Sequence, residues 1–222
     1  FDNTVRRATS RNVIGILPGA KRPDEYVLYT AHWDHLGRCK PDATGDDICN
    51  GAVDNATGTA MLAALAEANV KAGAADRSQV FLAVTLEESR LLGSEYYAQN
   101  PVYPLNRTVG GVNMDAIAPG QPARDVQVVG GDKSELTRYL QATMKAMKLR
   151  LSPEEDIERG YYYRSDHFSM AKRGVPMFNL GRGTDWVPGG TTAARAAGDA
   201  YTKDAYHAPS DEYDGKWDWS GL

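Results

Sequence analysis

Runs of β-prone apolar residues alternate with helical patterns along most of the chain, and this alternation constrains the fold more than any other feature. The apolar runs are YVLYTA (26–31), SQVFLAVT (78–85), TVGGVNM (108–114) and VPMFNL (175–180). Helical patterns occupy 55–73, 89–100 and 134–148. Strands that alternate with helices favour a mostly parallel sheet covered on both faces. We therefore predict an α/β three-layer sandwich, and we expect the Gly/Ala/Thr-rich stretch 181–200 to form a long surface loop.

Length and charge fit one globular domain and argue against several classes of partner. A chain of 222 residues is long enough for a single α/β domain with its own core. The net charge is −4 and Lys and Arg form no run, so neither nucleic acid nor an anionic membrane is indicated as a partner. No apolar stretch reaches the ~18–20 residues of a membrane helix, and no signal peptide is present. Because the sequence starts abruptly at FDNTVRRATS, we expect a fragment or a processed form.

Cys39 and Cys49 lie in one polar segment, GRCKPDATGDDICNG. A disulfide closing this loop would contribute roughly 2–3 kcal/mol of stability, and the alternative is a pair of unrelated free thiols. An unpaired thiol in an exposed segment is a liability, so we favour the disulfide and, with it, a secreted or periplasmic protein. The spacing is far from C-x₂₋₄-C, which argues against metal binding by this pair.

Side chains that can hold a metal ion follow the predicted strands. In open α/β sheets, ligands bind beyond the carboxyl ends of the strands. The side chains in question are His32 and Asp34 after the first strand, Glu87 and Glu88 after the second, and Asp115 after the third. Asp54 lies just before the helix that follows the first strand, and His207 lies near the end, in AYHAPSDEYD.

Each of these residues also has an ordinary structural explanation. Asp54 could cap a helix, the Glu87–Glu88 pair could be a solvated helix start, Asp115 could cap a turn, and a lone His207 is most often a surface histidine. His35 has no partner in the pattern, and we assign it no functional role. The ordinary explanations must all hold at once, however, while every group falls at one edge of the sheet. That coincidence favours a site.

The ligand types fit two divalent ions that share one carboxylate, as in centres whose ions lie ~3.5–4 Å apart. The candidate ligands are His32, Asp54, Glu88, Asp115 and His207. Imidazoles and carboxylates without a thiolate suit zinc, with cobalt or manganese as substitutes. Asp34, two residues after His32, could orient its imidazole from behind. Glu87, next to a ligand, is placed to take a proton from a water held by the ions.

Five motifs together resemble the co-catalytic metallopeptidases of the M28 aminopeptidase family. They are HWDHLG, GAVDNATG, LEESRLLGSEYYA, NMD and YHAPSDEYD, and they occur in order between residues 12 and 222. The resemblance implies a zinc exopeptidase-like, phosphorylase/hydrolase-like fold with two Zn²⁺ ions bridged by Asp54. It implies His32 and Asp115 at one ion, and Glu88 and His207 at the other. It also implies Glu87 as general base and acid.

The segment YYYRSDHFSMAKRGVP (161–176) matches a further motif of the family. In related enzymes a tyrosine shortly before this motif donates a hydrogen bond to the carbonyl oxygen as it becomes an oxyanion, a contribution of roughly 3–4 kcal/mol. Alignment makes Tyr162 the first candidate for this role and Tyr163 the second. The alternative is that these tyrosines only pack against other aromatic side chains. His167 is not assigned to the metal.

The resemblance implies a zinc-dependent exopeptidase that hydrolyses peptides with a metal-bridging water activated by Glu87. Among exopeptidases, the resemblance favours an aminopeptidase. Residues 1–222 are then expected to form a single zinc peptidase catalytic domain and, because related proteins extend beyond both ends of this sequence, a fragment of a longer chain. No residue marks a pocket for an α-amine or an α-carboxylate. The alternatives are a glutaminyl-cyclase-like transferase with a single zinc and a non-catalytic peptidase-like binding module.

Overall fold

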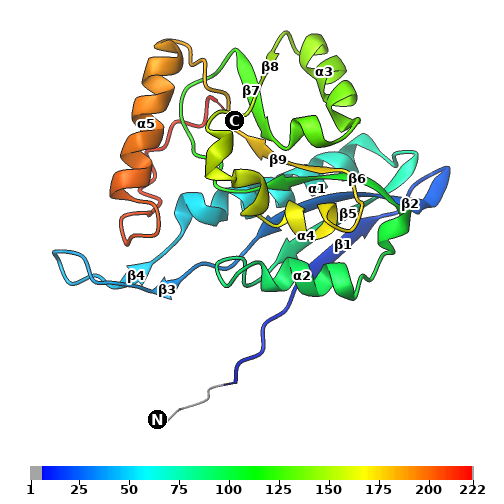
Figure 1. Cartoon of the computed structure of the whole chain (residues 1–222), viewed down its shortest axis with the longest axis horizontal. Helices are drawn as coiled ribbons and strands as arrows, with labels where there is room; N and C mark the ends of the chain where they lie inside the picture. The colour runs from blue at the N-terminus through cyan, green and yellow to red at the C-terminus, as the bar shows by residue number, and fades with distance from the viewer. Residues whose placement is uncertain (1–6, 222) are drawn as a thin grey trace.

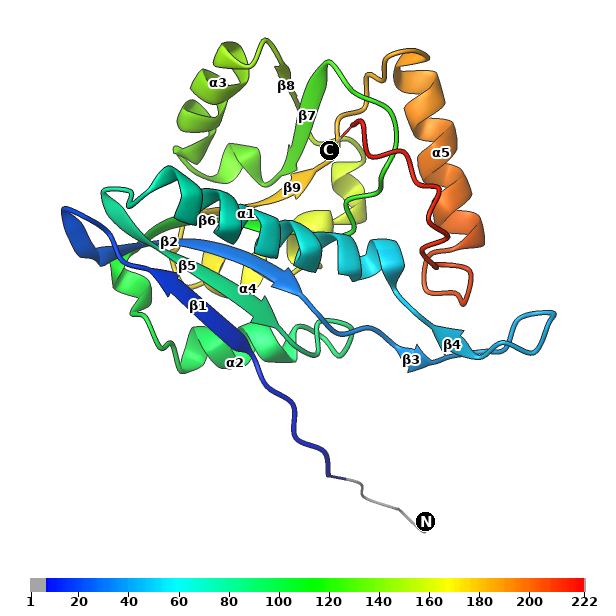
Figure 2. The ribbon, with the colours of Figure 1, turned by 180° about the vertical axis from the view of Figure 1, so that it is seen from behind.

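The computed structural model describes residues 7–221, which are built around a seven-stranded sheet (Figures 1 and 2). The strands are β1 (Val13–Leu17), β2 (Arg22–His32), β3 (Gly37–Arg38), β4 (Ile48–Cys49), β5 (Arg77–Val84), β6 (Thr108–Met114), β7 (Asp125–Val129), β8 (Arg150–Ser152) and β9 (Met177–Gly181). The α-helices are α1 (Gly58–Ala72), α2 (Leu92–Gln99), α3 (Leu136–Ala146), α4 (His167–Ala171) and α5 (Gly190–Asp204). None of the helices in 7–221 is long and apolar enough to cross a membrane.

The strand order β1-β5-β2-β6-β9-β7-β8 confirms the predicted mostly parallel sheet. Strands β5, β2, β6 and β9 run parallel to one another, whereas β1 pairs antiparallel with β5 and β7 pairs antiparallel with β9. At the far edge, β8 runs parallel to β7. Because the four central strands point the same way, their carboxyl ends meet at one edge of the sheet.

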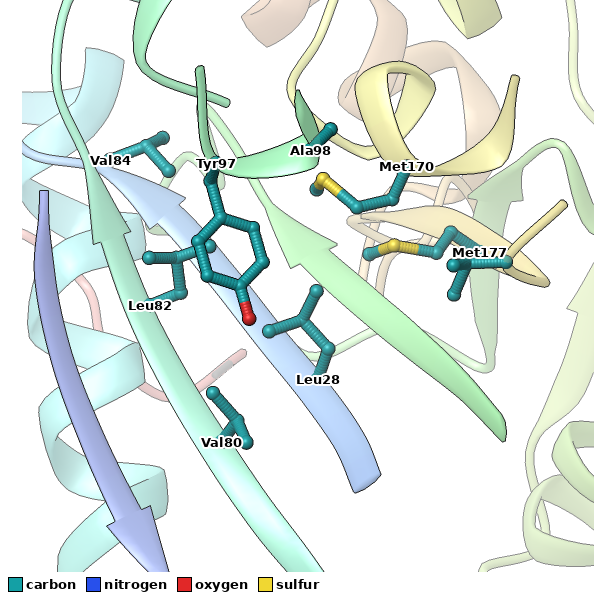
Figure 3. Packing of buried hydrophobic residues seen from close by; sticks show 9 residues of the cluster. Leu28, Val80, Leu82, Val84, Tyr97, Ala98, Met170 and Met177 are labelled. Atoms are coloured by element: carbon teal, nitrogen blue, oxygen red, sulfur yellow. The ribbon is translucent and has the colours of Figure 1, made fainter. Parts of the chain in front are cut away.

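Helices cover both faces of this sheet, with α1 on one face and α2 and α4 on the other (Figures 1 and 2). Alternate residues of β5 divide the core between the two layers. Leu82 joins Tyr97 of α2 and Met170 of α4 in one cluster, shown in Figure 3. Phe81, the preceding residue, packs with Leu62 of α1 in the other. Each such buried side chain contributes roughly 1.5–3 kcal/mol, so the central strands form a rigid platform.

The predicted surface loop at 181–200 is wrong, because its second half is helical. α5 begins at Gly190, after Gly189 with a left-handed φ of 105°, and ends at Asp204. The segment carries five alanines within Gly190–Ala200, and alanine has the highest helix propensity of all residues. Glycine and threonine are common in loops, but here Gly189 and Gly190 stand at the start of a helix and the alanines extend it.

The helix predicted from residue 55 begins later, because Ala52–Thr57 form an irregular turn before α1. Asp54 (φ −111°, ψ 86°) and Asn55 (φ −140°, ψ 44°) leave the helical region. The peptide bond between them is cis. The non-helical φ and ψ of Asp54 set the direction in which its side chain leaves the turn.

The disulfide between Cys39 and Cys49 is present, as predicted. It closes the loop that joins β3 to β4, and this hairpin projects from the body of the protein (Figure 1). The Sγ atom of Cys49 lies 3.4 Å from the carbonyl oxygen of His207. The loop therefore contacts the segment that follows α5.

The outer strands are joined to the chain after β9 through the carboxylate of Asp125, which is 3% exposed. It accepts hydrogen bonds from the Ser152 hydroxyl of β8 at 2.5 Å, from the Thr184 hydroxyl at 3.1 Å and from the Asp185 amide at 2.8 Å. Burial would raise the pKa of Asp125, but these bonds outweigh it and lower the pKa below its ordinary value.

We expect Asp125→Asn to lower the free energy of unfolding at pH 7 by about 1–3 kcal/mol, since the amide cannot accept all of these bonds. A carboxyl whose pKa is lower in the folded state contributes stability above its unfolded pKa of about 3.9 and loses it as pH falls through the folded value. The gap between wild type and variant should therefore narrow below about pH 4. Urea unfolding as a function of pH measures it, and a gap that stays constant into acid would contradict the assignment.

Candidate metal centre

The candidate residues predicted from the sequence converge at the carboxyl edge of the sheet. His32 is the last residue of β2, Glu87 and Glu88 follow β5, and Asp115 follows β6. Asp54 comes from the irregular turn before α1, and His207 follows α5, which stands beside that turn in both views (Figures 1 and 2).

The carboxylate of Asp54 lies between the two histidines. Its Oδ1 is 3.2 Å from Nε2 of His32, and its Oδ2 is 3.2 Å from Nε2 of His207. Nε2 of His32 is also 3.2 Å from Oδ1 of Asp115. On the other side, Nε2 of His207 is 3.2 Å from Oε2 of Glu88. The cluster thus has two halves that share one carboxylate.

His35, which the sequence analysis left without a role, lies in the second half of the cluster. Its Nδ1 is 2.8 Å from Oε1 of Glu88, and its ring centroid is 5.5 Å from that of His207. His35, Asp54 and Glu88 bring three potential ligand atoms within 4.8 Å of one another. Spacing alone could not identify His35, because only the bend of the chain after β2 turns it toward Glu88.

The charges of the cluster perturb its titration. Burial lowers the pKa of His32, but its contacts with Asp115 and Asp54 outweigh burial and raise it to about 12. Burial would likewise raise the pKa of Asp54, but the neighbouring histidines hold it below its ordinary value. The carboxylate of Asp54 also raises the pKa of His207. Together these shifts favour protonated histidines beside an ionised Asp54 carboxylate, so the cluster stabilises positive charge next to Asp54.

The donor atoms fit divalent cations. Within residues 7–221, Oε1 of Glu88 and Nε2 of His207 are buried and make no hydrogen bond, although neighbouring donors and acceptors lie close. Close approach without hydrogen-bond geometry is typical of ligands directed at a common centre. Imidazole and carboxylate donors without thiolate suit zinc, cobalt or manganese.

Asp34 contacts His32 differently from the prediction. Nδ1–H of His32 donates to the backbone carbonyl of Asp34 at 3.1 Å, whereas the Asp34 carboxylate is 3.8 Å away. That bond leaves Nε2 of His32 facing Asp54 and Asp115. Oδ1 of Asp34 accepts the amide N–H of Glu87 at 3.2 Å. Asp34 therefore joins the end of β2 to the turn that carries Glu87.

Glu87 faces a cavity of about 410 Å³ at the cluster. Residues that line it include Asp54, Glu87, Asp115, Tyr161, Arg164 and Tyr206. Burial, and then the charges of Asp115 and Asp166, raise the pKa of Glu87 to about 9. Divalent cations in the cluster would oppose this rise, because they stabilise a nearby carboxylate.

Tyr162 is not among the described residues that line this cavity, and Tyr161 lines it instead. The Tyr162 ring packs edge-on against His167 at 5.1 Å and Tyr163 at 5.3 Å between centroids. Residues 161–163 form a 3₁₀ turn, in which successive side chains point about 120° apart. The structure thus places Tyr162 in the aromatic packing that was its alternative interpretation.

Two buried asparagines that the sequence analysis did not single out hold the cluster together. The side chain of Asn55 donates a hydrogen bond to the Met114 carbonyl at 2.9 Å and accepts one from the Ala116 amide at 3.1 Å. It therefore fixes the backbone on both sides of Asp115. The side chain of Asn113 donates to the Ser165 hydroxyl at 2.7 Å, and that hydroxyl donates to Asp115.

Residues 12–222 match the model of peptidase family M28. Aminopeptidase NAALADL1 of Mus musculus is 34% identical over 119 residues, which are 51% of this chain and 14% of that protein. The chain therefore spans about one seventh of that relative's length.

Two solved structures share the fold. An aminopeptidase from Aneurinibacillus sp. strain AM-1 has a TM-score of 0.61 at 22% identity, with 90% of this chain and 42% of that chain covered. A glutaminyl cyclase of Porphyromonas gingivalis has a TM-score of 0.62 at 17% identity, with 90% and 69% covered. At these identities the likeness shows the fold alone.

Gly51 allows Asp54 and His35 to approach each other. Its φ is 65°, and a Cβ atom there would lie 2.3 Å from the Asp54 carbonyl oxygen and 2.4 Å from Cγ of His35. We expect Gly51→Ala to weaken divalent-ion binding, measured by isothermal titration. Gly37→Ala is the control, because Gly37 has a φ of 68° with nothing within 4 Å of a Cβ. Both variants should lose about 1–2 kcal/mol from backbone strain, and equal ion affinities in the two would refute the close-approach argument.

Proposed function

The chain belongs to peptidase family M28, and on that premise we propose that it is a zinc-dependent exopeptidase acting as an aminopeptidase. The observation that carries the proposal is the shared carboxylate of Asp54, which faces His32 with one oxygen and His207 with the other. Two cation sites on one carboxylate characterise co-catalytic hydrolases. Residues 1–222 would act as one catalytic domain on a peptide that enters the cavity beside Glu87.

His32, Asp54 and Asp115 would hold one zinc ion, and Asp54, Glu88 and His207 would hold the second. Bound there, the ions would supply Lewis acidity toward water and the scissile carbonyl. His35, beside Glu88, would orient that carboxylate from behind. Cobalt or manganese could replace zinc, since both accept the same nitrogen and oxygen donors.

Glu87 would transfer the protons of the reaction. A carboxylate oxygen of Glu87 would accept a proton from the attacking water and later deliver it to the nitrogen of the leaving amine. The bond from the Glu87 amide to Asp34 fixes the backbone from which this side chain reaches the cavity. A buried carboxyl, whose pKa responds strongly to neighbouring charge, suits a group that must both take and give a proton.

Tyr161 would stabilise the oxyanion in place of Tyr162. Arg159 donates to the hydroxyl oxygen of Tyr161 at 3.0 Å, so the hydroxyl hydrogen is left to donate into the cavity. A donor held in place before the reaction stabilises charge that develops on the substrate oxygen.

The Cys39–Cys49 disulfide supports the further proposal that the protein is exported, either secreted or periplasmic. Disulfides persist in oxidising compartments and are rare in reducing ones.

We expect Glu87→Gln to retain the ions and to lose kcat by about 10²–10⁴-fold, because the amide keeps the shape of the side chain but cannot accept the proton. Elemental analysis after dialysis against trace zinc gives the ion content, and hydrolysis of aminoacyl p-nitroanilides gives kcat. Glu67→Gln is the control, because Glu67 is an exposed residue of α1 paired with Lys71.

The same measurements discriminate between the candidate functions. Two zinc ions per chain with peptide hydrolysis support the proposal. One ion with cyclisation of N-terminal glutamine would favour a glutaminyl-cyclase-like transferase, and ions without turnover on any peptide would favour a binding module. Undiminished hydrolysis by Glu87→Gln would remove Glu87 from the mechanism.

We expect Tyr161→Phe to lower kcat by about 10²–10³-fold with little change in KM, since its hydroxyl acts on the developing charge rather than on the bound substrate. Tyr162→Phe should leave both constants nearly unchanged. Steady-state kinetics of the two variants measures the difference. The reverse ranking would return the oxyanion role to Tyr162.

A further inference from the structure

Asp211 is a buried carboxylate that contacts the backbone beneath the metal centre. It is 2% exposed. Its Oδ1 accepts the amide N–H of Val53 at 2.9 Å, and its Oδ2 accepts the amide N–H of Asp54 at 3.1 Å. The hydroxyl of Tyr201, on α5, donates to the same Oδ2 at 3.2 Å. In addition, the Ala52 amide donates to the Asp211 carbonyl at 3.0 Å.

These bonds fix the segment from which Asp54 projects. Residues 52–54 lie in the irregular turn before α1, where the backbone of Asp54 leaves the helical region. Asp54 faces a histidine with each of its oxygens, so a small rotation of its backbone would remove one oxygen from its partner. The Asp211 side chain holds two successive amides of this turn and thereby opposes such a rotation.

Asp211 also connects the two halves of the cluster. It lies four residues after His207, and its own amide donates to the Ala208 carbonyl at 3.1 Å. The turn that carries His207 is thus joined through Asp211 to the turn that carries Asp54. A displacement of either turn would change the gap between Nε2 of His207 and Oδ2 of Asp54.

The partners of Asp211 are neutral. Among residues 7–221, no Lys, Arg or His nitrogen lies within 4.0 Å of its carboxylate. A buried carboxylate usually has a cationic partner, and here backbone amides and a tyrosine hydroxyl take that place. If Asp211 only stabilised the fold, it would not need to bond the amide of Asp54, the residue that both halves of the cluster share.

We propose that Asp211 is a positioning residue for the metal centre, which holds the Val53–Asp54 backbone so that the Asp54 carboxylate can bridge two divalent ions. This inference rests on the metal-dependent function proposed above. Tyr201 supports Asp211 from α5. Asp211 does not line the cavity beside Glu87 and acts through Asp54, whereas Tyr201 both bonds Asp211 and lines that cavity.

The test compares Asp211→Asn with wild type in three measurements on the full chain. Hydrogen exchange of the Val53 and Asp54 amides reports the backbone bonds without any ion. Titration with Co²⁺ reports affinity and, through its visible absorption, the coordination geometry. Hydrolysis separates kcat from KM. We expect faster exchange at both amides, Co²⁺ binding about tenfold weaker or more, an altered Co²⁺ spectrum, and a loss in kcat that exceeds any change in KM.

Glu212→Gln is the matched control. Glu212 is the exposed neighbour of Asp211 and is bonded to the Asn50 side chain, so its replacement removes one negative charge without releasing residues 52–54. Equal weakening of Co²⁺ binding in both variants would show a general charge effect and overturn the proposal. Wild-type Co²⁺ affinity, spectrum and kcat in a merely less stable Asp211→Asn would also overturn it.

Tyr201→Phe carries the test if Asp211→Asn does not fold, since it removes one bond to Asp211 and keeps both amide bonds. We expect a smaller change in the same direction, and an unchanged Co²⁺ spectrum and affinity would count against the proposal. A wild-type chain that binds ions but hydrolyses no peptide would defeat the peptidase proposal, while the exchange and Co²⁺ measurements would still decide the role of Asp211.

Discussion

The buried carboxylate of Asp54 is the group on which the arrangement of the site depends. It is 4% exposed and lies between His32 and His207. Removing a carboxylate from water costs several kcal/mol unless positive charge or hydrogen-bond donors surround it. The histidines supply such partners, and divalent cations between the same atoms would supply them more strongly. The irregular turn before α1 places Asp54 where both histidines can reach it.

The parallel sheet supplies the rigid frame for this carboxylate. His32, Glu87, Glu88 and Asp115 come from consecutive carboxyl ends of β2, β5 and β6, and the core on both faces fixes those ends relative to one another. The remaining residues of the cluster come from turns, which lack the backbone hydrogen bonds of a sheet. Side-chain hydrogen bonds hold these turns in place instead, and Asn55 links the turn that carries Asp54 to the end of β6.

Much of this arrangement was predictable from local pattern. The buried strands appear in the sequence as apolar runs, and 108–114 coincides with β6. The Cys39–Cys49 disulfide was predictable from its polar, loop-like context. α5 was not, because its glycines and threonines obscured an alanine-rich helix. His35 was also missed, since nothing near it in the sequence indicates that it approaches Glu88.

The sequence by itself determined which chemical groups follow each strand, and with them the carboxylate and imidazole chemistry of the edge. Strand periodicity and the parallel connections carry that information locally. Only the tertiary structure decided which atoms face one another. Three consecutive tyrosines are equivalent in sequence, yet in a 3₁₀ turn they point about 120° apart, so Tyr161 meets the cavity and Tyr162 packs against His167. The same holds for Asp34, whose carbonyl rather than carboxylate bonds His32, because such choices depend on backbone angles set by distant contacts.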